Sequence, residues 1–281
     1  MNPRQLLLPV YRSLRPVVDT LHLNSIARPV WAMLWRSPER KLIRARQNDR
    51  LWWLDPQVAL GGEVYEAATV AWLRSVIKPG MTVVDVGANV GQLSLEMAHL
   101  VGATGRVISV EPSPGNLRFL RTHISANGFD DRVTIVEAAC CAQERGELIL
   151  EVRGSDINSI ENGPQLKGLG LQRNPVDGEQ PAIQVKVQTM SLDALCLKFG
   201  LKIDVLKVDV EGAELEVFRG ASTSLAKYKP KIIFGFHPFA FQDSEQARRE
   251  LEVLFGAADM LVENSSGMSR WTLQEYTVRV K

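Results

Sequence analysis

Short apolar runs alternate with amphipathic helical patterns along most of the chain after residue 82. Strands separated by helices of this length are typical of βαβ units, which build a mostly parallel sheet covered by helices on both faces. The pattern therefore predicts an α/β, Rossmann-like fold. The predicted strands are residues 82–86, 106–110, 132–136, 203–208, 231–236, 260–262 and 276–280, and the predicted helices are residues 92–101, 114–127, 192–199 and 243–255.

One long segment, residues 153–181, interrupts this alternation. It is rich in Gly, Asn, Asp and Pro and shows little periodicity, and the apolar runs 148–152 and 183–187 that flank it can pair as a hairpin. A loop of this length inside a domain is usually either functional or without structure of its own. We expect a lid over a substrate site, and an excursion with no role stays as the alternative.

The first 50 residues differ from the rest in charge. They hold ten Lys and Arg residues and three acids, interleaved with Leu, Val and Trp, whereas the whole chain has a net charge of only +1. A basic amphipathic segment with Trp is typical of contact with anionic lipid. Five prolines between residues 3 and 38 divide the segment into short pieces, which favours a helical cap instead. We therefore predict a helical extension over residues 1–60 and one catalytic domain over residues 61–281, with lipid contact through residues 1–50 as the alternative.

Composition narrows the class of protein further. The 281 residues are 45% apolar and 23% charged, as in ordinary globular proteins, and there is no apolar run of about 18 residues that could span a membrane. Three cysteines do not form a disulfide framework, and strand alternation predicts one thiol of the Cys140-Cys141 pair inside and one outside. We expect a cytoplasmic protein, at most peripheral at the inner face of a membrane, with no nucleic-acid partner.

Acidic residues stand at the ends of three predicted strands. Asp85, Glu111 and Asp209 close the first, second and fourth strands. Because the carboxyl ends of parallel strands meet at one edge of the sheet, and ligands bind there where the strand order reverses, these three acids indicate the ligand site.

The turn after the first strand is rich in glycine. Gly87 and Gly91 allow the backbone to turn sharply from strand to helix and to come close to a ligand. A dinucleotide fingerprint of the form GxGxxG needs a third glycine where this chain has Asn89. The turn alone is therefore weak evidence for any one cofactor.

Charge distinguishes between cofactors more clearly. The phosphates of a nicotinamide nucleotide or of ATP would meet the acids at the strand ends with little compensating base nearby, whereas S-adenosylmethionine has no phosphate and carries a positive sulfonium. Glu111 is expected to accept hydrogen bonds from both ribose hydroxyls. The alternative is that Glu111 is a solvated carboxylate at the end of a strand. The predicted cofactor is S-adenosylmethionine, held by Asp85, Gly87, Asn89, Gly91 and Glu111.

Several motifs in combination carry a family resemblance. They are D-V-G-A-N-V-G at 85–91, V-E-P at 110–112, S-L-D at 191–193 and D-V-L-K-V-D-V-E-G-A-E at 204–214. Together they resemble the FkbM family of S-adenosylmethionine-dependent methyltransferases, from G-E-V-Y-E at 62–66 to His237-Pro238. The resemblance implies a class I methyltransferase fold with a seven-stranded sheet and O-methylation of a sugar or natural-product hydroxyl. Members commonly have an acid where this chain has Gly235, two residues before the His-Pro pair.

Transfer of a methyl group to an alcohol requires alignment of donor and acceptor and removal of the acceptor proton. His237 is the first candidate for the general base because imidazole titrates near neutral pH, and a hydrogen bond within its own turn is the alternative. Asp209 could orient the acceptor, hold the methionine amino group, or join Glu211 at a cation. With two nearby carboxylates and no adjacent third ligand, no metal is predicted. Glu214 is interpreted as an acid that complements the dipole of a helix.

The predicted function is therefore methyl transfer from S-adenosylmethionine to a hydroxyl of a sugar, glycolipid or secondary metabolite, with His237 and Asp209 as catalytic residues. Two alternatives stay open. One is an inactive S-adenosylmethionine-binding sensor or scaffold, suggested by Gly235. The other is a nicotinamide-dependent oxidoreductase, disfavoured by Asn89 and the acidic strand ends. The expected partner is a small-molecule or glycan acceptor, whose identity the sequence does not reveal.

Overall fold

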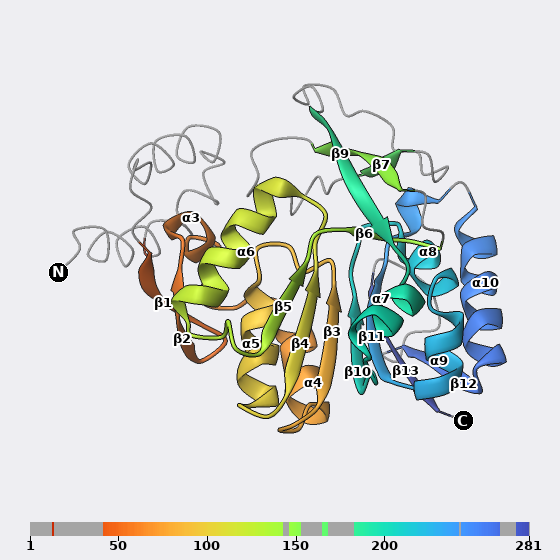
Figure 1. Ribbon diagram of the computed structural model, residues 1–281, viewed down its shortest axis with the longest axis horizontal. Helices are drawn as coiled ribbons and strands as arrows, with labels where there is room; N and C mark the ends of the chain where they lie inside the picture. The colour runs from red at the N-terminus through yellow and green to blue at the C-terminus, as the bar shows by residue number, and fades with distance from the viewer. Residues whose placement is uncertain are drawn as a thin grey trace.

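A mostly parallel seven-stranded sheet forms the centre of the computed structural model (Figure 1). The structure describes residues 42–142, 146–152, 165–167, 183–241, 243–264 and 274–280, together with residue 13. In spatial order the strands are β12 (Met260–Asn264), β13 (Gln274–Val280), β11 (Lys231–Phe236), β10 (Val205–Val208), β3 (Thr82–Val86), β4 (Arg106–Val110) and β5 (Val133–Val136).

The strand order reverses next to β3. The chain runs from β3 to β4 and β5 on one side, then returns to add β10 and β11 on the other side, and all five strands are parallel. Only β13 runs antiparallel to its neighbours, β11 and β12. This is the sheet that the family resemblance implies, and its reversal between β3 and β10 is the place where ligands bind in such sheets. The predicted fold and the predicted closing pair of strands are confirmed.

Helices cover both faces of the sheet because successive strand residues point to opposite sides. Val83 packs into one apolar cluster with the first group of helices, and Val84 packs into a second cluster with the other group. The first group is α3 (Pro56–Ala59), α4 (Ala67–Val76), α5 (Gln92–Val101) and α6 (Pro114–Ala126), and the second is α7 (Leu192–Phe199), α8 (Glu214–Arg219), α9 (Ser222–Tyr228) and α10 (Ser244–Ala257). A short 3-10 helix, η1 (Pro238–Ala240), follows β11.

A β-hairpin precedes the domain and corrects the predicted helical extension. Strands β1 (Ile43–Gln47) and β2 (Arg50–Leu54) pair antiparallel around Asn48 and Asp49, which both have positive φ. Two such residues make the tight turn that suits a two-residue hairpin, and the buried positions alternate with a period of two. Helix is therefore wrong for residues 43–54. The rest of the predicted extension before residue 42 lies outside the described residues, except for residue 13.

A second, smaller sheet lies beyond the carboxyl ends of the main strands (Figure 1). Its order is β6 (Ala139–Cys140), β9 (Ile183–Met190), β7 (Glu147–Val152) and β8 (Gln165–Lys167). The pairing of β7 with β9 confirms the predicted hairpin. Most of the predicted lid, residues 153–164 and 168–181, lies outside the described residues. Cys140 and Cys141 are both buried, so the prediction of one exposed thiol was wrong.

No helix in the described part of the chain is long and apolar enough to cross a membrane.

Candidate active site

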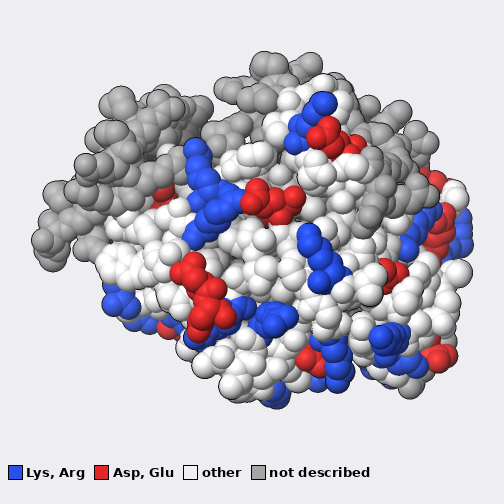
Figure 2. Space-filling view, in the orientation of Figure 1, with Lys and Arg blue, Asp and Glu red and all other residues white. Residues whose placement is uncertain are grey.

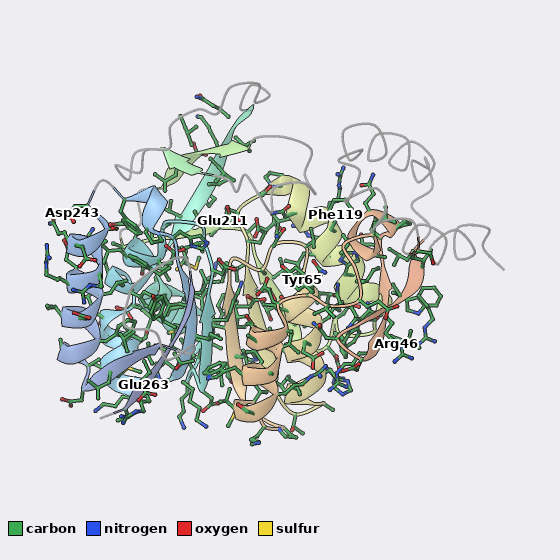
Figure 3. All side chains as sticks on the ribbon, turned by 180° about the vertical axis from the view of Figure 1, so that it is seen from behind. Arg46, Tyr65, Phe119, Glu211, Asp243 and Glu263 are labelled. Atoms are coloured by element: carbon green, nitrogen blue, oxygen red, sulfur yellow. The ribbon has the colours of Figure 1, made fainter. Side chains whose placement is uncertain are left out.

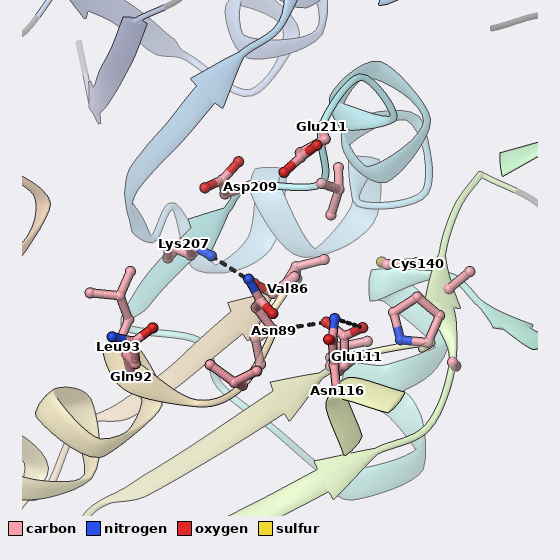
Figure 4. A pocket seen from close by; sticks show the side chains of 18 of the residues that line it. Val86, Asn89, Gln92, Leu93, Glu111, Asn116, Cys140, Lys207, Asp209 and Glu211 are labelled. Carbon is pink, nitrogen blue, oxygen red and sulfur yellow. Dashed lines mark hydrogen bonds between the residues drawn. The ribbon is translucent and has the colours of Figure 1, made fainter. Parts of the chain in front are cut away.

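A cavity opens at the carboxyl ends of the strands where their order reverses (Figure 4). It encloses about 860 Å³ of space, including open solvent at its mouth. Four predicted site residues line it: Gly87, Asn89, Glu111 and Asp209. The other three, Asp85, Gly91 and His237, are not part of its wall.

The turn after β3 contacts the backbone after β10 most closely at Gly87, where only glycine fits. Gly87 has a φ of +79°, and a Cβ atom there would lie 1.8 Å from the carbonyl oxygen of Asp209. Any side chain at this position would therefore collide with the backbone that follows β10. Gly91, with a φ of +90°, caps α5 and faces Leu120 instead of the cavity. The first glycine thus brings two strand ends together, and the second lets the helix begin.

Glu111 is fixed in place by three donors. Its Oε2 accepts from the backbone N–H of Asn89 at 2.8 Å, and its Oε1 accepts from the N–H of Ser113 at 2.9 Å and from Asn116 Nδ2 at 3.1 Å. Burial raises the pKa of Glu111, and these donors oppose the rise. The carboxylate is only 3% exposed, so it is not a solvated strand-end acid. Glu111 lines the cavity, where ribose hydroxyls could donate hydrogen bonds to its carboxylate.

Asp85 lies behind the wall of the cavity, paired with a buried lysine. Its Oδ2 accepts from Ser94 Oγ at 2.6 Å, and Lys207 Nζ lies 3.3 Å from its Oδ1. Lys207 also donates to the carbonyl oxygen of Gly87 at 2.9 Å and itself lines the cavity. Burial alone would lower the pKa of Lys207, but the negative charges of Asp85, Asp209 and Glu66 hold it above its usual value.

Lys207 corrects the expectation that the acidic strand ends have little compensating base nearby. The only sequence signal was a single lysine inside the apolar strand V-L-K-V. Buried lysines occur almost always with partners, so that signal indicated a buried acid beside it.

Tyr65 and Glu66 form another part of the cavity wall. In the sequence they stand out only as part of the motif at which the family resemblance begins. Asn48, in the hairpin turn, donates through Nδ2 to the carbonyl oxygen of Tyr65 at 2.7 Å and accepts from its N–H at 3.0 Å. Glu66 follows with a φ of +42°, which is unusual for a residue other than glycine. The hairpin thus positions both side chains at the cavity, and burial raises the pKa values of both.

His237 lies beside Asp209, between two carboxylates. Its Nδ1 is 2.8 Å from Glu214 Oε1, and its Nε2 is 3.7 Å from Asp209 Oδ1. Burial alone would lower the pKa of His237, but Glu214, Asp209 and Glu211 outweigh it, so the pKa lies above its usual value. Glu214 is completely buried and accepts from the N–H of Gly212 as well. It therefore does more than complement the dipole of α8, which was its predicted role.

Asp209, Glu214 and His237 also form a candidate cation site. Asp209, Glu214 and His237 offer atoms that all lie within 4.8 Å of one another, the one such group found among the described residues. Two carboxylates and an imidazole could coordinate a divalent cation. However, the hydrogen bond between Glu214 and His237 accounts for their closeness without an ion, and the prediction of no metal is kept.

The cavity is acidic overall. Glu66, Glu111, Asp209 and Glu211 line it, and Lys207 is its one cation among the described residues. Figure 4 shows Asp209 and Glu211 on one side of the space and Glu111 with Asn116 on the other. In Figure 3, Tyr65 and Glu211 lie between the ends of the molecule marked by Arg46 and Asp243. A cationic ligand suits such a wall better than a phosphate does.

Comparison with known proteins gives a family match. The family model described as "Methyltransferase FkbM domain" matches residues 85–264. Ribosomal protein L11 methyltransferase of Carboxydothermus hydrogenoformans is 28% identical over 114 residues, which are 40% of this chain and 34% of that protein. Ribosomal RNA large subunit methyltransferase E of Nitrosomonas europaea is 28% identical over 112 residues, 38% of this chain and 52% of that protein. The chain thus spans about a third to a half of these curated relatives.

The chain is also similar to a solved structure. Methyltransferase FkbM from Methylobacillus flagellatus is 15% identical, with a TM-score of 0.45, and the alignment covers 79% of this chain and 53% of that one.

Proposed function

Because this chain belongs to the FkbM family of S-adenosylmethionine-dependent methyltransferases, we propose that it transfers the methyl group of S-adenosylmethionine to a hydroxyl of a sugar, glycolipid or secondary metabolite. Because the chain belongs to this family, the alternative of a nicotinamide-dependent oxidoreductase is excluded.

The donor would occupy the cavity between β3, β4 and β10. Glu111 would accept hydrogen bonds from the ribose hydroxyls, and the turn from Gly87 to Asn89 would face the amino-acid end of the donor. Asp209 lies across the space from Glu111, and its negative side chain would attract the sulfonium of the donor. Because most charged groups of the wall are carboxylates, a cationic donor is favoured there over its neutral product.

The observation that carries this proposal is the imidazole of His237 beside Asp209, with its other nitrogen bound to Glu214. An alcohol is a weak acid, so its attack on the methyl carbon is assisted by a base at the point where its proton leaves. In the proposed reaction His237 accepts that proton, and Asp209 orients the hydroxyl. A scaffold that only binds the donor would have no need of this pair, although Gly235 departs from the family pattern.

Two of the relatives carry names that refer to ribosomal RNA and to a ribosomal protein, so RNA and protein acceptors need to be tested too. The phosphates of RNA would meet Glu66, Asp209 and Glu211 around the cavity, and the one lysine of the described wall is already paired with Asp85. Basic and acidic side chains are interspersed over the face seen in Figure 2. This distribution favours an uncharged hydroxyl acceptor over a polyanion.

The test uses S-adenosylmethionine with an isotopically labelled methyl group. Methyl glycosides, a glycolipid extract, small phenols, ribosomal RNA and ribosomal protein are incubated with the purified chain and with the Asp209→Asn and His237→Gln variants. We expect label in methyl ethers of the hydroxyl compounds and a loss of about 100-fold or more in the His237 variant. Label only in RNA or protein would contradict the proposed acceptor, and donor binding with no transfer to any acceptor would favour the scaffold.

A further inference from the structure

The contacts of His237 assign separate roles to its two ring nitrogens. A carboxylate can only accept a hydrogen bond, so Nδ1 must carry the proton that is shared with Glu214 Oε1 at 2.8 Å. The other nitrogen, Nε2, then faces Asp209 Oδ1 at 3.7 Å. Glu214 is fully buried and held by the N–H of Gly212 as well, so it fixes the ring from the side away from the cavity.

Gly235 leaves space beside this pair. A Cβ atom there would lie 3.1 Å from His237 Cε1 and 3.2 Å from Asp209 Oδ1, closer than side chains normally pack. The backbone of Gly235 does not have a positive φ, so its conformation does not call for glycine. A glycine inside a strand usually marks a close approach, and here it leaves room for the imidazole of His237 beside Asp209.

We propose that Glu214 is a positioning residue that makes Nε2 of His237 the proton acceptor, and that binding of the cationic methyl donor releases a proton from this nitrogen. The inference rests on the proposed function and deepens it. It concerns the charge of the ring before and after the donor binds.

Three negative groups face the ring. They are Glu214 in α8, Asp209 at the end of β10 and Glu211 in the turn between them. Together they hold the pKa of His237 above its usual value, and so they favour the charged form of the ring while the cavity is empty. A charged imidazole has no lone pair with which to accept a proton.

Donor binding changes this balance. S-adenosylmethionine brings a positive sulfonium into a cavity that Asp209 lines, and a positive charge near Asp209 weakens the attraction between Asp209 and the ring. The ring then loses its Nε2 proton to solvent and becomes a base. By linkage, donor affinity rises with pH through the pKa of His237, whereas the affinity of the neutral product does not.

The following step balances in atoms and electrons. The acceptor O–H bond breaks and its proton moves to Nε2, while the oxygen forms a bond with the methyl carbon. The bond between that carbon and sulfur breaks, and its electron pair stays on sulfur, which gives neutral S-adenosylhomocysteine. The charged ring now faces a neutral product, which is the state that Glu214 and Asp209 favour.

The test is an NMR titration of histidine ring protons, which requires no acceptor. The chain has four histidines, and the His237→Gln variant assigns the resonance of His237. We expect the pKa of His237 to be lower by about one unit or more with S-adenosylmethionine than with S-adenosylhomocysteine. In the free protein Glu214→Gln should lower the pKa by a similar amount, because the amide keeps the shape of the side chain but not its charge.

Glu216→Gln is the matched control, since Glu216 lies in the same helix and pairs with Arg219. It should leave the pKa of His237 unchanged. Equal pKa values of His237 with donor and product would overturn the coupling, and an unchanged pKa in Glu214→Gln would overturn the role of Glu214. If that variant does not fold, the comparison of donor with product in the unaltered chain still decides the coupling. Failure of the donor to bind at all would instead count against the proposed function.

Discussion

Asp85 and Glu111 stand at the ends of neighbouring parallel strands, yet their surroundings give them different roles. Asp85 is still inside β3, where it pairs in register with Ser109 and Lys207 and is completely buried. Glu111 is the first residue after β4, where the backbone has left the sheet, and it lines the cavity. One position along the strand therefore decides whether an acid supports the site from behind or meets the ligand.

The first prediction concerns Glu111. Glu111→Gln replaces a charged acceptor by a neutral amide, so the ribose hydroxyls lose a charge-assisted hydrogen bond. Titration calorimetry should show about 10- to 100-fold weaker binding of both S-adenosylmethionine and S-adenosylhomocysteine, since both carry the ribose. Glu137→Gln, at an exposed residue paired with Arg121, is the control. Unchanged affinity in Glu111→Gln would remove Glu111 from the cofactor site.

A second prediction concerns Gly87. Gly87→Ala would place a Cβ atom 1.8 Å from the carbonyl oxygen of Asp209, and chemical denaturation should show a loss of about 4 kcal/mol or more in the free energy of unfolding. Gly128 has nearly the same φ, +72°, but nothing within 4 Å of its Cβ position. Gly128→Ala should therefore cost only about 1–2 kcal/mol of backbone strain. Equal losses in the two variants would show that the contact with Asp209 does not matter.

A third prediction concerns metal ions. Since the hydrogen bond between Glu214 and His237 explains the closeness of the acidic pair and the imidazole, we expect no divalent cation to bind there. Adding Mn²⁺ should leave the NMR signal of the His237 ring as sharp as those of the other histidines. Selective broadening of that signal, reversed by a chelator and absent in Asp209→Asn, would identify a metal site and contradict this prediction.

At the scale of elements, most of the regular βαβ units could be read from the sequence to within two residues, whereas α4, α8 and α9 were not among the predicted helices. Gly91 and Gly102 flank α5 at the predicted residues, and Ser191 caps α7 through a hydrogen bond from the N–H of Ala194. These signals are local, so the chain itself displays them. The hairpin of residues 43–54 was missed because its basic and aromatic side chains were interpreted as part of a helical extension, although the buried positions alternate with a period of two.

The site could be predicted only in part. Glu111 and Asp209 could be predicted because they follow strands, and a parallel sheet brings the carboxyl ends of its strands together whatever their distance in sequence. The rest of the site depends on which way a side chain turns and on which distant segment packs beside it. This holds for the positions of Lys207 and Tyr65 and for the contact of Glu214 with His237. Pairing across 23 residues, as between Glu214 and His237, leaves no periodic signal in the sequence.

The hairpin yields a prediction of its own. Asn48→Gly keeps the positive φ of the turn but removes both side-chain hydrogen bonds to Tyr65. The free energy of unfolding should fall by about 1–3 kcal/mol, and calorimetry should show weaker donor binding because Tyr65 and Glu66 lose their support. Asp49→Gly, at the other positive-φ position of the same turn, should leave donor binding unchanged. Weaker binding in both variants would mean that the turn, and not the contact with Tyr65, supports the wall.

At the scale of the whole molecule, one sheet separates two apolar clusters and carries the cavity at one edge. The core therefore lies on both faces of the sheet, and the polar site is left at the strand ends, where backbone and charged side chains meet solvent. The first 40 residues of the basic segment precede β1, which begins at Ile43, so they can be removed without cutting the hairpin.

A chain without residues 1–40 tests the role of that segment. The interpretation as a cap predicts that the full chain shows equal, weak association with vesicles of neutral phosphatidylcholine and with vesicles that contain phosphatidylserine, measured by co-sedimentation at physiological salt. Salt-sensitive binding to the anionic vesicles alone, lost in the shortened chain, would establish lipid contact instead.

The central claim is that the acidic cavity at the strand ends holds a cationic methyl donor. Titration calorimetry of the purified chain with S-adenosylmethionine and with NAD tests it most directly, because the two ligands share an adenosine but differ in charge. We predict binding of S-adenosylmethionine with one site per chain and no measurable heat with NAD. Tight binding of NAD with none of S-adenosylmethionine would contradict the account.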